Sequence, residues 1–197
     1  MKKELKILLA AYSFSTFAFS MLAPIYAIFI EKIGGGILEA SYAISIFTFM
    51  SGLLIFLMSR WENRLKHNEK LLTIGYLILS VAFFSYMFVS RPWHIYIVEV
   101  IFSFGIATLA PVYDGLYSKN LDRGNSISEW GNWEGMGYII SAFAALAGGF
   151  LTNYFGFQVL FFVMFILSLI AVFISLGIAS NKNLTNLNKK RIKNKNF

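Results

Sequence analysis

The sequence predicts an all-α membrane protein built from six transmembrane helices. The chain has 197 residues, of which 57% are hydrophobic and only 14% are charged, whereas a typical soluble domain is about 25% charged. Its charged residues leave uncharged stretches long enough to cross a bilayer, and its basic residues gather on one predicted side of the membrane. These observations argue against a soluble globular enzyme and exclude a disordered chain.

The six spans follow from the gaps between charged residues, because a transmembrane helix needs about 20 mostly apolar residues. Glu99 and Asp114 interrupt the fourth gap, and a predicted turn at Asn153–Gly156 divides the last long uncharged stretch. One transmembrane domain is predicted over residues 1–180, followed by a basic, disordered cytoplasmic tail at residues 181–197. The predicted spans are residues 7–30, 38–59, 71–90, 95–117, 129–152 and 157–179.

The first span resembles a secretory signal peptide in one respect, since Lys2, Lys3 and Lys6 precede it. Its apolar stretch is too long for a signal peptide, so the segment is predicted to be a retained first helix. Pro24 removes a backbone donor inside this helix and is predicted to kink it, and Pro111 is predicted to do the same in the fourth span.

The basic residues predict the orientation of the helices. With six spans both termini lie on one side, and that side receives all but Lys32 and Arg91 of the 17 Lys and Arg residues. Cytoplasmic loops carry an excess of Lys and Arg, so both termini are predicted to be cytoplasmic. The net charge of +7 is therefore interpreted as a signal of membrane topology. For the basic tail, contact with anionic lipid headgroups is an alternative role. Nucleic acid is not an expected partner.

A glycine-containing stretch near the end of the predicted domain carries the clearest motif. Ala147–Phe162 reads AGGFLTNYFGFQVLFF, in which Gly148 and Gly149 close one predicted helix and Gly156 and Phe157 open the next. Paired small residues let two helix backbones approach closely inside a membrane. The stretch resembles the end of the fifth helix and the start of the sixth in the major facilitator superfamily.

Two further regions fit the same superfamily, with departures. Its second and third helices are joined by a gating loop with the motif G-x-x-x-D-[RK]-x-G-[RK], and Ser59, Asn63 and Arg64 stand at the first Gly, the Asp and the basic position. Asn63 cannot supply the negative charge of that Asp. In the fourth helix Gly105 fits the glycine-rich packing pattern, but the Arg expected four residues earlier is Ile101, so proton-coupling schemes that use that Arg do not transfer.

The resemblance implies the N-terminal half of a twelve-helix transporter, whose two six-helix halves are parallel repeats around a central cavity. A parallel homodimer would recreate that arrangement, with the first and fourth helices lining the cavity and the second and fifth facing the other half. The implied function is secondary transport of a small solute of unknown identity by alternating access, in the inner or plasma membrane of a prokaryotic cell. The alternatives are a non-transporting structural or accessory membrane protein and one half of a heterodimeric transporter.

Small and polar residues recur on one face of each of the first two spans. In the first span Ser13, Thr16 and Ser20 are candidates for the substrate pathway, and packing within the chain is the alternative. On the second span these residues are predicted either to contact the other half or to pack within the chain. They are Ser41, Ser45, Thr48 and Gly52.

Acidic residues inside a span are costly and are therefore candidates for function. Glu99 lies near the outer end of the fourth span and shares a face with Ser103 and Asp114. If that face meets the cavity, Glu99 carries a proton or binds a cationic group. The alternatives are that its side chain extends to the membrane interface or pairs with Arg91 or His94.

The cytoplasmic side of the bundle holds a second set of candidates. In the superfamily an acidic residue at this end of the fourth helix pairs with the gating loop, so the resemblance implies that Asp114 latches to Arg60 or Arg64. Glu134, near the start of the fifth span, is a candidate for the inner mouth of the pathway, with a pair to Arg123 as the alternative.

Other classes of function find no support in the sequence. The chain has no Cys and two distant His residues, so neither a metal nor another cofactor is expected. No phosphate-binding loop, dinucleotide turn or nucleophile elbow is found, so no enzyme activity is expected. An aromatic belt at the membrane interfaces accounts for Trp93, Tyr96, Trp130, Trp133 and Tyr154 without a ligand.

Overall fold

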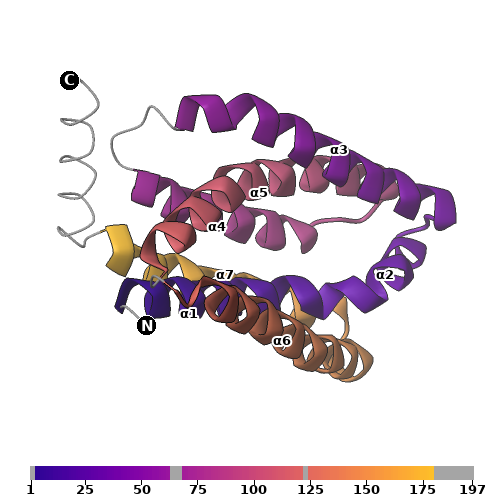
Figure 1. Cartoon of the computed structure of the whole chain (residues 1–197). Helices are drawn as coiled ribbons and strands as arrows, with labels where there is room; N and C mark the ends of the chain where they lie inside the picture. Colours follow the sequence, from indigo (N-terminus) through magenta and orange to yellow (C-terminus); the bar gives the residue numbers. More distant parts are fainter. Residues whose placement is uncertain (1–2, 63–67, 122–123, 180–197) are drawn as a thin grey trace.

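The computed structural model describes residues 3–62, 68–121 and 124–179, and that part of the chain is helical without a β-strand (Figure 1). The predicted tail at residues 181–197 lies outside these ranges. Within them, five segments are long and apolar enough to cross a membrane, and Lys70–Tyr86 forms a shorter apolar helix. The elements are α1 (Lys3–Leu22), the 3-10 turn η1 (Ala23–Ile25), α2 (Tyr26–Lys32), α3 (Ile37–Glu62), α4 (Asn68–Tyr86), α5 (Pro92–Asn120), α6 (Ser126–Phe155) and α7 (Phe157–Ala179).

The first membrane segment consists of two helices because Pro24 interrupts it. Pro24 lies in η1 between α1 and α2, where its ring leaves the backbone without an N–H donor. The predicted kink is therefore a break in the α-helix. Pro111 behaves differently, since α5 continues through it; membrane helices tolerate proline where neighbouring groups satisfy the freed backbone.

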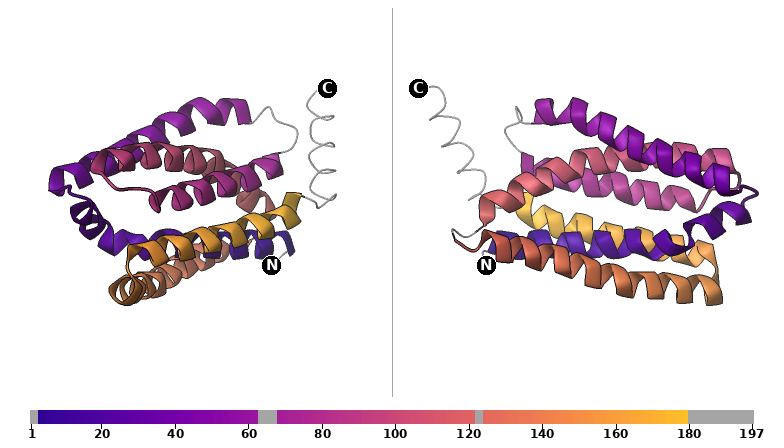
Figure 2. Two further views of the ribbon diagram at one scale, coloured as in Figure 1. Left: turned by 180° about the vertical axis from the view of Figure 1, so that it is seen from behind. Right: turned by 45° about the vertical axis from the view of Figure 1, so that its right-hand side comes forward.

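The helices form an open row in the order α3, α5, α4, α7, α1 and α6 (Figures 1 and 2). Each helix packs against the next in this order, whereas α3 and α6 at its two ends make no comparable contact in the described structure. Contacts between α1 and α5 are also few. The bundle is therefore open between α3 and α6.

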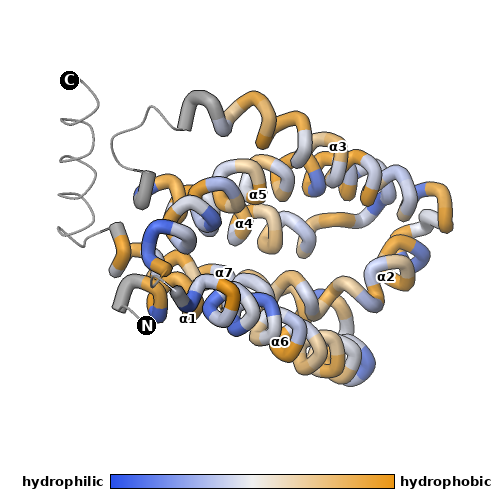
Figure 3. Tube along the Cα trace, viewed as in Figure 1, coloured by the Kyte–Doolittle hydropathy of each residue, from blue (hydrophilic) through white to orange (hydrophobic). Residues whose placement is uncertain are grey.

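The start of α1 and the end of α7 lie at the same end of the bundle. Apolar residues run along all the helices (Figure 3).

Two helix backbones approach closely where α6 crosses the end of α1. A Cβ atom on Gly148 would overlap the carbonyl oxygen of Met21, so this crossing requires glycine. Gly105 of α5 packs against α4, where its Cβ would lie 2.5 Å from Leu79 Cδ2. A Cβ on Gly149, by contrast, would meet no atom of the described residues within 4 Å. The Cβ direction of Gly149 thus points into open space in this part of the chain.

The connection between α6 and α7 is a single residue. Gly156 has a φ of 82°, a left-handed conformation that side chains other than glycine rarely adopt. Its N–H donates to the carbonyl oxygen of Thr152 at 2.9 Å and so closes the last turn of α6. The connection is shorter than the predicted turn because α6 continues through Phe155.

Candidate functional site

Two cavities lie between α1 and α5, and each is named here after the acidic residue that lines it. The Glu99 cavity has a volume of about 260 Å³ and the Asp114 cavity a volume of about 460 Å³. The Glu99 cavity is lined by Phe19, Leu22, Ala23, Tyr26, Ile44, Phe47, Thr48, Phe83, Tyr86, Glu99, Phe102 and Met164. The Asp114 cavity is lined by Tyr12, Ser15, Thr16, Phe19, Ser20, Tyr76, Leu79, Phe102, Ile106, Leu109, Ala110, Tyr113, Asp114, Trp133 and Ser141.

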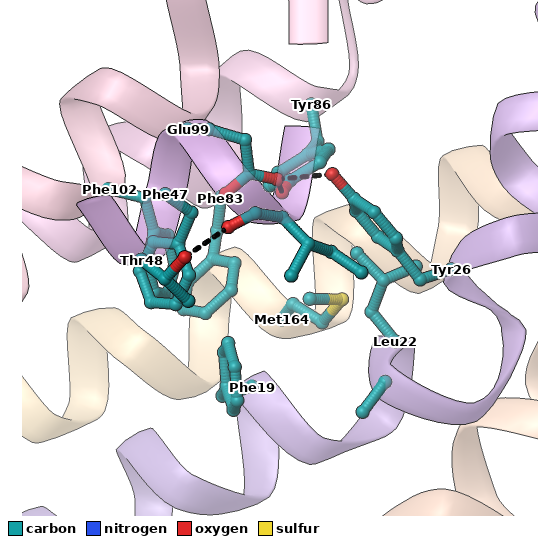
Figure 4. A pocket seen from close by; sticks show the side chains of 12 residues that line it. Phe19, Leu22, Tyr26, Phe47, Thr48, Phe83, Tyr86, Glu99, Phe102 and Met164 are labelled. Atoms are coloured by element: carbon teal, nitrogen blue, oxygen red, sulfur yellow. Dashed lines mark hydrogen bonds between the residues drawn. The ribbon is translucent and has the colours of Figure 1, made fainter. Parts of the chain in front are cut away.

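Glu99 is a buried acid held by two tyrosines (Figure 4). It is 5% exposed, and its Oε1 accepts hydrogen bonds from Tyr26 of α2 at 2.5 Å and Tyr86 of α4 at 2.6 Å. The phenols take the place of water around a carboxyl group whose burial without partners would be costly. The side chain is thus buried rather than extended to the interface, and its partners in the described structure are tyrosines rather than Arg91 or His94.

A pair of phenylalanines is common to the two cavities. Phe19 of α1 and Phe102 of α5 line both of them, and their ring centroids lie 5.5 Å apart. The two acids of α5 line different cavities, since Glu99 lies in the wall of one and Asp114 in the wall of the other.

Buried polar groups without a partner line the larger cavity. The hydroxyls of Tyr76 and Tyr113 and the Nε1 of Trp133 have no hydrogen-bond partner among the described residues. Tyr12 packs against two of these rings, with centroid distances of 5.4 Å to both Tyr113 and Trp133. A buried donor left unpaired costs about 1–3 kcal/mol. A solute that supplies hydrogen-bond acceptors here would recover that cost.

The predicted pathway residues of α1 fall into two groups. Thr16 and Ser20 line the Asp114 cavity, and Ser20 shares a hydrogen bond of 2.9 Å with Ser141 of α6. Ser13 lies outside both cavities, and its hydroxyl contacts Met136 Sδ of α6 at 3.8 Å. Ser13 thus joins α1 to α6, and its place in the pathway stays a prediction.

Two further pathway candidates also lie outside the cavities. Ser103 is fully buried and donates to the carbonyl oxygens of Phe47 on α3, at 3.1 Å, and of Glu99, at 2.7 Å. It therefore fixes α5 against α3 one turn from Glu99. Glu134 is exposed on α6. The roles of both in a pathway stay predictions.

Asp114 lines the larger cavity from α5 and is exposed. Its predicted latch partners cannot be placed beside it, since Asn63, Arg64 and the side chain of Arg60 lie outside the described residues. The latch stays a prediction, and the structure places an acidic group at the wall of the Asp114 cavity.

Three tyrosines of the two cavities carry no signal in the sequence. Tyr26, Tyr76 and Tyr86 stand in apolar stretches without a motif around them. Trp133, predicted to belong to an interfacial belt, also lines the Asp114 cavity, and the belt stays a prediction. These residues come together only because particular helices pack against one another. The hydropathy of single spans does not predict which helices pair.

Removing single hydroxyls tests this geometry through stability. We expect Tyr76→Phe to leave the thermal stability unchanged or to raise it, because this hydroxyl has no partner in the described structure. Tyr86→Phe removes a hydrogen bond to the Glu99 carboxyl group and should lower the free energy of unfolding by about 1.5–3 kcal/mol. Thermal unfolding of the purified protein in detergent measures both, and equal losses would contradict the hydrogen bonding described above.

Comparisons with known proteins identify the family of the chain. The family model of the Major Facilitator Superfamily matches residues 8–195. Among curated proteins the chain is similar to the uncharacterized MFS-type transporter YitZ of Bacillus subtilis (strain 168), with 25% identity over 151 residues, which are 77% of this chain and 92% of that protein.

A solved structure shares the fold. The POT family transporter PepTSo matches 89% of this chain with a TM-score of 0.67 and 15% sequence identity. The chain spans 37% of the length of that transporter, so the likeness concerns the fold of one part of it. With the family match extending over nearly the whole sequence, this chain belongs to the major facilitator superfamily of membrane transporters.

Proposed function

We propose that the protein is a secondary transporter of a small solute that works by alternating access as a parallel homodimer of six-helix bundles. In transporters of this kind two bundles rock against each other around a site near the middle of the membrane. The superfamily supports membrane transport as the class of function. The second bundle is supplied, in this proposal, by a second copy of the chain.

The open side of the bundle is the observation that carries the proposal. The helices α3 and α6, which border it, bury a smaller share of their residues within the bundle than α1, α5 and α7 do. A lipid-facing surface needs only large apolar side chains, whereas small residues allow another helix to pack closely. The residues Ser41, Ser45, Thr48 and Gly52 of α3 are small or polar and are all exposed.

A matching small face runs along α6. Gly131, Ala142 and Gly149 share one side of this helix by their spacing. A Cβ on Gly131 or Gly149 would meet no atom of the described residues within 4 Å. In a dimer related by a two-fold axis along the membrane normal, α3 of each copy would pack against α6 of the other. Both small faces would then be covered.

The lining of the cavities suits an amphipathic solute. Aromatic rings dominate both walls, and the Asp114 cavity adds the hydroxyls of Thr16 and Ser20 and the unpartnered donors of Tyr76 and Trp133. The sequence has no ATPase motif, so a gradient of an ion or of the solute would drive transport. In this account both termini are cytoplasmic and Asp114 closes the inner end by pairing with the gating loop.

Two-sided access to one residue tests the transport cycle. We expect Thr16→Cys, at the wall of the Asp114 cavity, to react with a membrane-impermeant maleimide added from either side of the membrane. The chain has no native Cys, so the label reports this position alone. Glu31→Cys, exposed on α2, should react from one side only. Labelling of Thr16→Cys from a single side would contradict alternating access and favour a non-transporting accessory protein.

A further inference from the structure

We propose that the Glu99 cavity binds a small organic cation, with the positive group beside Glu99 and the apolar body among the aromatic rings. The inference rests on the proposed function for the use of the cavity in transport, and it names the substrate class. The binding itself is a property of one bundle, so it is measurable without transport.

The first observation is a buried acid without a cationic partner. The described hydrogen-bond partners of the Glu99 carboxyl group are the hydroxyls of Tyr26 and Tyr86, and both donate to Oε1. No described residue donates to Oε2, and no Lys, Arg or His in the described ranges forms an ion pair with Glu99. Acidic groups inside membrane segments usually pair with an opposite charge or mark a ligand pathway. A cationic ligand would supply the missing charge.

The second observation is the wall of rings around this acid. Phe47 of α3 and Phe83 of α4 pack edge to face on Phe102 of α5, with centroid distances of 5.6 and 5.2 Å, and all three line the cavity. The described residues of the lining include no Lys, Arg or His that would repel a cation. Aromatic rings attract a cation within about 6 Å of the ring centroid, and quaternary ammonium groups are recognised by such cages.

The third observation is the size and access of the cavity. Its volume of about 260 Å³ accommodates a small amine with a single ring. Phe19, Ile44 and Thr48 line it and are exposed, so it opens at the surface of the bundle. The break in the first span contributes Ala23 and Tyr26 to the same wall.

The donor set favours an organic cation over a metal ion. Hard metal cations take about six or more oxygen ligands. This cavity offers one carboxyl group, two phenols and the hydroxyl of Thr48, which already donates to the carbonyl oxygen of Ile44 at 2.9 Å. Among the described residues no group of His, Cys, Asp and Glu gathers that would hold a metal.

Calorimetric titration of the full chain in lipid nanodiscs with benzyltrimethylammonium tests the proposal. The alcohol 2-methyl-1-phenylpropan-2-ol has a similar shape without the charge. We expect the cation to bind about tenfold or more tightly than the alcohol, and Glu99→Gln to weaken cation binding by about 10- to 100-fold. Glu31→Gln, which removes an exposed acid outside the cavity, should leave binding unchanged.

A second variant protects the test against loss of folding. Phe47→Leu keeps the acid and removes one ring, and it should weaken the cation several-fold while the alcohol changes less. Thermal unfolding shows which variants are folded. Equal affinity for cation and alcohol, or unchanged cation affinity in a folded Glu99→Gln or Phe47→Leu, would overturn the proposal.

The outcomes separate this proposal from the proposed function. Cation binding together with one-sided labelling of Thr16→Cys would contradict the transporter and leave the cation site standing. Labelling of Thr16→Cys from both sides without cation binding would support the transporter and overturn the cation site.

Discussion

Gly148→Ala is expected to lower the free energy of unfolding by about 1–3 kcal/mol. The new Cβ would overlap the carbonyl oxygen of Met21, so α6 must move away from the end of α1. A backbone oxygen cannot rotate aside as the end of a flexible side chain does, and the packing along the crossing is lost with it. Thermal or chemical unfolding of the purified protein in detergent measures the loss.

Gly177→Ala on α7 is the matched control for this variant. No atom of the described residues lies within 4 Å of the position that its Cβ would take. Alanine favours a helix over glycine by about 1 kcal/mol, so stability should stay the same or rise slightly. If Gly148→Ala were tolerated as well as Gly177→Ala, the close crossing of α1 and α6 would be wrong.

Gly149→Trp, one residue further along α6, is expected to separate the dimer while the bundle stays folded. Open space surrounds Gly149 in the described structure, and we propose that α3 of the second copy fills it. A large ring there would hold the two bundles apart and remove the close packing on which membrane helices depend. The dimer dissociation constant should rise by about tenfold or more, as it does when about 1.4 kcal/mol of interface energy is lost.

Single-molecule subunit counting in a supported bilayer measures this change. Gly177→Trp adds the same ring on α7, away from the proposed interface, and should leave the dimer intact. An unchanged dimer with Gly149→Trp would show that the small face of α6 meets lipid rather than a second copy.

Charge gaps and one proline predict much of the layout of this bundle. A charged residue is costly inside a bilayer, so the gaps mark the membrane segments directly. The helices nevertheless run past them, since α5 covers Pro92–Asn120 where residues 95–117 are predicted. Helix ends depend on backbone hydrogen bonds at the interface, which hydropathy does not report. The interruption of the first span at Pro24 could be predicted because the missing N–H of proline affects the helix locally.

The candidate site was less predictable because it depends on partners far apart in the sequence. Glu99 stands out as an acid in an apolar span, but its partner Tyr26 lies 73 residues away. Gly148 and Gly149 look equivalent in the sequence, yet one touches the backbone of α1 and the other faces open space. Only the rotation of α6 about its axis distinguishes the two, and that rotation is set by packing.

Crosslinking between two copies of the chain tests the central claim, that α3 of one bundle meets α6 of another. Gly52→Cys and Ala142→Cys are made in separate, differently tagged chains, which is straightforward because the sequence has no native Cys. Treated in membranes with a short bis-maleimide, the mixture should yield a crosslinked dimer that carries both tags. Gly52→Cys mixed with Gly177→Cys should yield none. Absence of the two-tag product from the first mixture would contradict the homodimer.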